Sequence, residues 1–135
     1  MTPQADPPSP GPGGAQVADL QAVPDELRLL RQIVDESADC IKVLDLDAHL
    51  LSMNAGGQRV MEIGDFSVCE RALWPSFWPE ATQPDVAAAL AAARAGQTGH
   101  FSGFCPTFRG TPRWWDVTVS PVRDAAGTVT RLLAV

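Results

Sequence analysis

The stretch that decides the fold is CIKVLDLDAHLLSMN, residues 40–54. Two short and mostly apolar runs, IKVL and LLSM, flank an acidic turn, and both are rich enough in strand formers to pair as a β-hairpin. Asp45 and Asp47 lie in the turn, where a carboxylate can accept hydrogen bonds from nearby backbone N–H groups. Asn54 precedes AGGQRVMEI and suits the N-cap of a helix. The stretch therefore predicts a hairpin that leads directly into a helix.

The region before this hairpin divides into two parts. Residues 1–23 are dominated by Pro, Gly and small residues that cannot bury a core, so we expect a disordered tail. Residues 24–37 are predicted to form a helix, because Pro24 suits the first helical position and acidic residues follow it. Apolar side chains recur in this helix at helical spacing and draw a stripe that can pack on its own domain or on a second copy of the chain. The stripe consists of Leu27, Leu30, Ile33 and Val34.

The rest of the sequence moves from helical to extended patterns. We expect a short helix over residues 54–63, an irregular segment over 64–80 that prolines interrupt, and an alanine-rich helix over 82–96. Three strand-like runs follow, over residues 100–108, 113–123 and 127–135. This order predicts an α+β fold in which an antiparallel sheet carries its helices on one face.

The middle one of these last three runs, RWWDVTVSPVR, shows which of its side chains face the core. Because successive side chains of a strand point to opposite faces, alternate residues share a side. We expect one set to face the core, namely Trp115, Val117 and Val119. The other set is expected on the more polar outer face, namely Trp114, Asp116, Thr118 and Ser120.

Three fragments in this order carry a family resemblance: DCIKVLDLDAHLLSMNA, LWPSFWPE and WWDVTVSPVRDAAGTVTRLLAV. The chain resembles a PAS domain of the type found in bacterial sensor histidine kinases, over residues 38–135. The resemblance implies a five-stranded antiparallel sheet in the spatial order 2-1-5-4-3, a small pocket between sheet and helices, and dimerisation through the preceding helix. It also implies that the chain is a fragment cut at the end of the last strand.

Ala48 departs from this resemblance. The family usually has a glycine at that position of the hairpin turn, where it would permit a left-handed backbone. A left-handed conformation costs alanine about 1 kcal/mol, so we expect the turn to differ slightly there.

Composition and charge exclude several classes of function. The chain of 135 residues has a net charge of −6, which argues against binding nucleic acid or anionic lipid. Its basic residues are scattered singly, and Lys42 is the only lysine. Its longest nearly apolar run, VAAALAAARA, is too short to span a bilayer, and no secretory signal is visible. A cytoplasmic location is therefore expected.

Three cysteines, Cys40, Cys69 and Cys105, stand at wide spacings without a CxxC or Cys/His cluster. A metal site is not expected, and each thiol is interpreted as an ordinary buried residue. Haem is disfavoured because the alanine-rich helix has no histidine, while His49 and His100 fall at a turn and at a strand start. A flavin photoadduct is disfavoured because Cys69 lacks polar neighbours that would hold the ring. The identity of any cofactor stays unknown.

The resemblance places a pocket among apolar side chains, and a filled core would have the same composition. The candidate lining residues are Met53, Val60, Met61, Phe66, Trp74, Phe77, Phe101, Phe104 and Trp115. A small apolar ligand is the partner considered. Asp116 either anchors a ligand, pairs with Arg113 or is a solvated carboxylate.

Three functions follow from these observations. The first is a sensory input module, the N-terminal part of a sensor histidine kinase or a similar multi-domain regulator in a two-component phosphorelay. The second is a ligand-free dimerisation or spacer domain, and the third a small α+β enzyme. No catalytic residue is predicted, since no phosphate loop, nucleophile elbow or histidine kinase segment is present.

Overall fold

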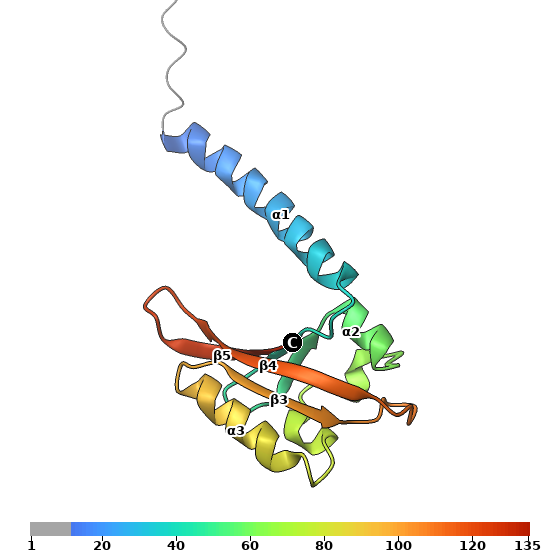
Figure 1. The fold of residues 1–135 in the computed structure, drawn as a ribbon. Coiled ribbons are helices and arrows are strands. Elements are labelled where there is room, and N and C mark those ends of the chain that lie inside the picture. Colours follow the sequence, from blue (N-terminus) through green and yellow to red (C-terminus); the bar gives the residue numbers. More distant parts are fainter. Residues whose placement is uncertain (1–11) are drawn as a thin grey trace, which may run out of the picture. The chain divides into compact units, whose positions relative to one another are not determined.

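The computed structural model describes residues 12–135 and consists of three α-helices, two short 3-10 helices and five strands (Figure 1). The helical elements are α1 (Pro12–Glu36), α2 (Ala55–Val60), η1 (Phe66–Val68), η2 (Trp74–Phe77) and α3 (Gln83–Arg94). The strands are β1 (Lys42–Leu44), β2 (Leu50–Met53), β3 (Gly99–Phe104), β4 (Trp114–Arg123) and β5 (Val129–Ala134). The boundary between two compact units lies between Ile33 and Val34.

The five strands form one antiparallel sheet in the order β2-β1-β5-β4-β3, which confirms the predicted α+β fold and strand order. Helix α3 lies across one face of this sheet, against β3, β4 and β5 (Figure 1). Its close approach requires a glycine in β3, because a Cβ at Gly99 would stand 2.5 Å from the Cα of Ala89. The first and last strands of the sequence are neighbours, with Lys42 of β1 paired with Ala134 of β5.

The two predicted faces of β4 are confirmed. Val117 and Val119 are buried in the core and Trp115 is half-buried against it. Trp114 is 72% exposed on the opposite face. The same alternation in β3 turns Phe101 inward and Phe104 outward.

The hairpin turn keeps a left-handed residue in spite of its alanine. Ala48 has φ +68°, and its buried methyl group belongs to the core. Asp45 makes the turn, because its Oδ1 accepts hydrogen bonds from the N–H groups of Asp47 (3.0 Å) and His49 (2.8 Å). The turn is therefore formed by Asp45, as expected, and Ala48 adopts the left-handed conformation that costs alanine more than glycine.

Replacing Asp45 with Ala is expected to lower the free energy of unfolding by about 1 kcal/mol at neutral pH. Burial tends to raise the pKa of Asp45, but hydrogen bonds from His49 and Asp47 and the charge of His49 outweigh it and lower the pKa below 3.8. Stability that depends on the carboxylate is therefore present above pH 3.8 and is lost as the pH falls through the lowered pKa.

Urea denaturation at neutral and acidic pH tests this, and the difference between wild type and Asp45→Ala should shrink in acid. Asp47→Ala, which removes an exposed carboxylate from the same turn, is the matched control and should change little. A difference for Asp45→Ala that stays constant with pH would contradict the assigned role of the carboxylate.

Two helix boundaries differ by three residues or more from the sequence predictions. Helix α1 begins at Pro12 rather than Pro24, which lies inside it, so the predicted tail does not hold over residues 12–23. Residues 15–23 contain no Pro or Gly, and proline has a backbone φ that a helix accepts at the loss of one hydrogen bond. The part of the predicted tail over residues 1–11 lies outside the described residues. Helix α2 ends at Val60 rather than residue 63.

Asn54 caps α2 as predicted, with its Oδ1 accepting a hydrogen bond from the N–H of Gly57. A Cβ at Gly57 would stand 2.9 Å from the Cα of Cys40, so the glycine lets α2 approach the residues before β1. None of the helices over the described residues is both long and apolar enough to cross a membrane.

Candidate functional site

A small cavity lies between the sheet and the segments that cover it. Its walls come from β1, β2, η2, β4 and the residues next to them, so segments far apart in the sequence build it together. The lining residues are Cys40, Lys42, Met53, Met61, Trp74, Phe77, Trp78, Cys105 and Trp115. The volume open to the centre of a water-sized sphere is about 20 Å³, slightly more than one ordered water needs.

Lys42 is the one charged residue on this wall. Residues Cys40, Lys42 and Leu44 share the inward face of the first strand by the two-residue period, and Lys42 is 7% exposed. Its Nζ donates to the carbonyl oxygen of Cys40 (3.1 Å) and to Cys40 Sγ (3.2 Å). It also lies 6.0 Å from the centroid of the Trp74 ring.

No carboxylate among the described residues lies within ion-pair distance of Lys42. A buried charge is costly unless it is paired and hydrogen-bonded. The backbone carbonyl and the aromatic ring stabilise the ammonium only in part. Lys42 is therefore the least compensated group in the site.

Aromatic side chains form much of the rest of the cavity wall. Trp74 and Trp78 meet edge to face with ring centroids 5.8 Å apart, and Phe101 meets Trp78 in the same way at 5.0 Å. Trp115 Nε1 donates to the carbonyl oxygen of Cys105 at 2.8 Å. Trp78 Nε1 is buried and has no hydrogen-bond partner among the described residues. Besides the uncompensated charge of Lys42, the lining of the site thus includes a buried donor that lacks an acceptor.

The cysteines near the site are buried thiols. Burial raises the pKa of the Cys105 thiol although the positive charge of Lys42 opposes this, and Cys105 Sγ donates to the carbonyl oxygen of Phe77 at 3.1 Å. Burial, together with the charges of Cys40 and Glu70, also raises the pKa of the Cys69 thiol. A thiol with a raised pKa is a weak nucleophile. Cys69 is not among the lining residues of this cavity.

Five of the nine predicted lining residues lie on this cavity: Met53, Met61, Trp74, Phe77 and Trp115. Of the other four, Phe101 is buried in the adjacent core, Phe66 packs against that core, and Val60 is half-buried at the end of α2. Phe104 points to the outer face and is 40% exposed. It was assigned to the pocket together with Phe101, although an odd sequence separation places the two on opposite faces of β3.

Four lining residues were missed: Cys40, Lys42, Trp78 and Cys105. A signal for Lys42 existed in the sequence, because the alternation that turns Leu44 inward turns Lys42 inward as well. Trp78 precedes a proline in an irregular segment, where no periodicity shows the direction of a side chain.

The polar candidates of the sequence lie elsewhere. Asp116 is on the outer face, where it accepts a hydrogen bond from Ser102 Oγ and lies 3.1 Å from His100 Nε2, so its partners are these residues and not Arg113. His49 is half-buried, with its Nδ1 2.9 Å from Asp45 Oδ2. Within the described part of the chain, no three His, Cys, Asp or Glu side chains lie close enough together to hold a metal ion.

The sequence profile of a family described as the PAS fold matches residues 34–135. The chain belongs to the PAS family. The match begins at the end of α1 and covers the whole sheet, the three following helical segments and α3. PAS domains are generally sensory, and the cavity is enclosed by elements of this PAS domain.

Solved structures support the same fold. The PAS domain of an HTR-like protein from Haloarcula marismortui has a TM-score of 0.72 at 19% identity and covers 87% of this chain and 94% of its own. A PAS domain from Colwellia psychrerythraea has a TM-score of 0.69 at 13% identity, over 80% of this chain and 92% of its own.

A third structure, an RNA-binding light-oxygen-voltage receptor, has a TM-score of 0.68 at 20% identity. The match covers 99% of this chain but only 35% of the receptor. At these identities the likeness concerns the fold alone. No curated protein matches the chain.

Proposed function

We propose that this PAS domain is a sensory input module that binds a small molecule in the cavity described above. The observation that carries the proposal is the buried Lys42 ammonium, which faces an aromatic wall in a space that the protein leaves unfilled. A ligand-free spacer has no need of this arrangement, because an apolar residue would fill the space and stabilise the core.

The strand that carries Lys42 connects the cavity to both ends of the domain. Lys42 pairs with Met53 of β2 on one side and with Ala134 of β5 on the other. Met53 is followed by Asn54, whose Nδ2 donates to the carbonyl oxygen of Val34 at the end of α1 (2.7 Å). A ligand that shifts β1 therefore acts on the end of α1 and on the last strand.

Such a shift produces a signal only if the ligand binds two arrangements of the domain with different affinity. Met53 and Met61 line the cavity, and their unbranched side chains can change rotamer to admit a molecule larger than a water. The ligand would thus select the arrangement in which these side chains have moved apart.

Native mass spectrometry of the protein, purified from its own host, tests the proposal. We expect a copurifying small molecule that is released on denaturation and whose binding is weakened by Trp78→Ala, a change in the cavity wall. A protein that carries no molecule, with a cavity that binds none from a host extract, would favour the spacer function.

The parent protein proposed for this module is a cytoplasmic sensor histidine kinase or a similar multi-domain regulator. The support is the likeness of the three sequence fragments to PAS domains of that type, together with the pairing of Lys42 with Ala134 of the last strand. Autophosphorylation by the full-length protein that responds to the copurified molecule would support this context. A full-length protein with neither a kinase region nor another output domain would reject it.

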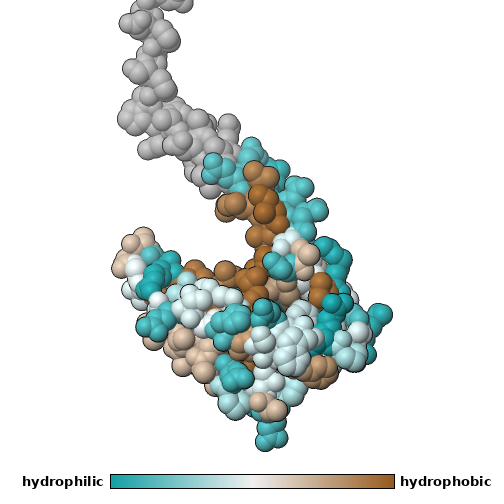
Figure 2. Space-filling model, viewed as in Figure 1, coloured by the Kyte–Doolittle hydropathy of each residue, from teal (hydrophilic) through white to brown (hydrophobic). Residues whose placement is uncertain are grey.

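A dimer through α1 is the second candidate, and its support is the exposure of the predicted stripe. Leu27, Leu30 and Ile33 are between 58% and 61% exposed, and Figure 2 shows apolar side chains gathered along this part of α1. An exposed apolar stripe of this kind fits a second copy of the same helix.

Replacing Leu30 with Glu is expected to shift the protein from dimer to monomer in sedimentation experiments, because the association would bury the new charge. Gln32→Glu adds the same charge to another part of the exposed helix surface and should leave the association unchanged. Equal sedimentation of wild type and Leu30→Glu would reject this helix as the dimer contact.

A further inference from the structure

We propose that the ligand of the cavity is a small organic monocarboxylate with an apolar body, held by an ion pair between its carboxylate and the ammonium of Lys42. The inference deepens the proposed sensory function and rests on it. The sequence alone predicted a small apolar ligand, whereas the ligand inferred from the structure is an anion.

The charge of the ligand follows from the environment of Lys42. The residue is 7% exposed, and no described carboxylate compensates its charge. Its hydrogen-bond partners are the carbonyl oxygen and the Sγ of Cys40. An ammonium can donate three hydrogen bonds, so one donor and the full positive charge are available for an anion. A buried ion pair is favourable once both charges and their hydrogen bonds are satisfied.

A second buried donor also favours a carboxylate ligand. Trp78 lines the cavity, and its Nε1 is buried without a partner among the described residues. Buried donors are nearly always paired in native proteins. A carboxylate has two oxygens. One can accept a hydrogen bond from the Lys42 ammonium and the other from the Trp78 indole N–H, since both residues line the cavity.

The other lining residues restrict the charge and the size of the ligand. The other lining side chains are aromatic rings, thioethers and thiols, and none carries a second positive charge. A phosphate monoester is largely a dianion at neutral pH, and a dicarboxylate would bring a charge that no residue here can pair. A single negative charge on a short aliphatic chain or a single ring matches these walls. Because the space between the side chains is small, its entry requires the rotamer changes of Met53 and Met61 described above.

The chain contains its own reporters for a binding experiment. Three of its four tryptophans, Trp74, Trp78 and Trp115, line the cavity. Trp114 is 72% exposed on the outer face of the sheet and serves as an internal control. Proton–nitrogen NMR spectra resolve the indole N–H signal of each tryptophan, so that a ligand in the cavity can be distinguished from one on the surface.

We would titrate the full chain with propionate, butyrate and benzoate, and separately with the corresponding neutral amides. We expect each carboxylate to shift the signals of Trp74, Trp78 and Trp115 but not that of Trp114. The amides, equal in size, should bind at least about tenfold more weakly, which corresponds to about 1.4 kcal/mol.

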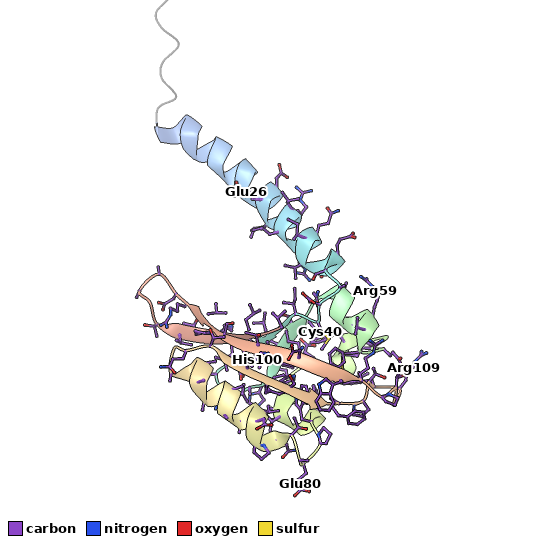
Figure 3. The ribbon with its side chains drawn as sticks, viewed as in Figure 1. Glu26, Cys40, Arg59, Glu80, His100 and Arg109 are labelled. Carbon is purple, nitrogen blue, oxygen red and sulfur yellow. The ribbon has the colours of Figure 1, made fainter. Side chains whose placement is uncertain are left out.

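Two variants and a control test the role of the charge. Lys42→Met keeps an unbranched side chain and should weaken the carboxylates at least about tenfold, whereas Lys42→Arg should retain most of the affinity. Arg109→Met removes the same charge from an exposed side chain in the loop between β3 and β4. Arg109 does not line the cavity and lies away from Cys40 in Figure 3. This variant should leave the affinity for carboxylates unchanged. Dispersed spectra of each variant show that it is folded.

The outcomes separate this inference from the function on which it rests. If amides bind as well as carboxylates, or if Lys42→Met binds carboxylates like wild type, the anion is rejected and a ligand-binding cavity remains. If neither class shifts the cavity signals and no molecule copurifies, both the anion and the sensory function are rejected.

Discussion

Replacing Asn54 with Ala is expected to lower the free energy of unfolding by about 3 kcal/mol, since each buried polar group that loses its partner costs about 1–3 kcal/mol. The Oδ1 atom accepts hydrogen bonds from the N–H groups of Ile41 (2.8 Å) and Gly57 (3.0 Å). The Nδ2 group donates to the carbonyl oxygens of Val34 (2.7 Å) and Asp39 (3.0 Å). Asn54 is 5% exposed, so water cannot easily replace these partners.

The loss is large because one side chain joins three segments. Val34 is at the end of α1, Asp39 and Ile41 precede β1, and Gly57 is in α2. The four hydrogen bonds hold these segments in one arrangement. A loss of 3 kcal/mol is a large part of the 5–15 kcal/mol that is usual for a domain.

Urea denaturation of wild type and Asn54→Ala measures this effect. Asp65→Ala is the matched control, because Asp65 also caps a helical turn through its Oδ1, at Ser67, but is exposed. It should cause a smaller loss. Equal losses for the two variants would show that Asn54 acts as an ordinary helix cap and does not hold the three segments together.

Replacing Lys42 with Met is expected to raise the free energy of unfolding by about 2 kcal/mol in the absence of ligand. The variant removes a buried charge that has no counter-ion, and replacing buried ionic groups with apolar side chains of similar volume is often stabilising by 1–4 kcal/mol. Methionine can fill the same space beside Trp74 and Met53, which also line the cavity.

Thermal and urea denaturation of the purified protein test this second effect, with Arg109→Met as the control that should stay within about 0.5 kcal/mol of wild type. A gain in stability together with a loss of carboxylate binding is the result expected of a residue kept for function at the expense of the fold. A clear loss of stability in Lys42→Met would show instead that the hydrogen bonds to Cys40 and the contact with Trp74 outweigh the cost of the buried charge.

The sequence contained enough local information for most of the fold. The hairpin follows from the acidic turn at Asp45, the start of α2 from the cap at Asn54, and the faces of β4 from the two-residue period. Each of these depends on residues within a few positions of one another, so their chemistry is visible without the tertiary structure. The strand order was predicted through the family resemblance, and not from these local patterns.

The cavity was only partly predictable, because its lining residues come from segments that are distant from one another in the sequence. Met53 and Trp115 were chosen as large apolar residues near the core, but the same choice included Phe104, which alternation in β3 turns outward. Trp78 lies in an irregular segment, where no periodicity predicts the direction of its side chain. The beginning of α1 was missed because Pro24 suits the first turn of a helix and also fits inside one.

By itself, the sequence determined the strands, the turn, the cap and the faces of this PAS domain, because these depend on short-range spacing and on backbone hydrogen bonding. Only the tertiary structure decided that the one lysine of the chain faces a cavity. That result depends on Lys42 lining one cavity with Trp74, Trp78 and Trp115, which come from other segments, and on the lack of a described carboxylate beside it. Alternation with Leu44 places Lys42 on the inward face, but a cavity beside the ammonium and the lack of a compensating charge are properties of the folded chain, so they cannot be assigned to a lysine from its neighbours in sequence.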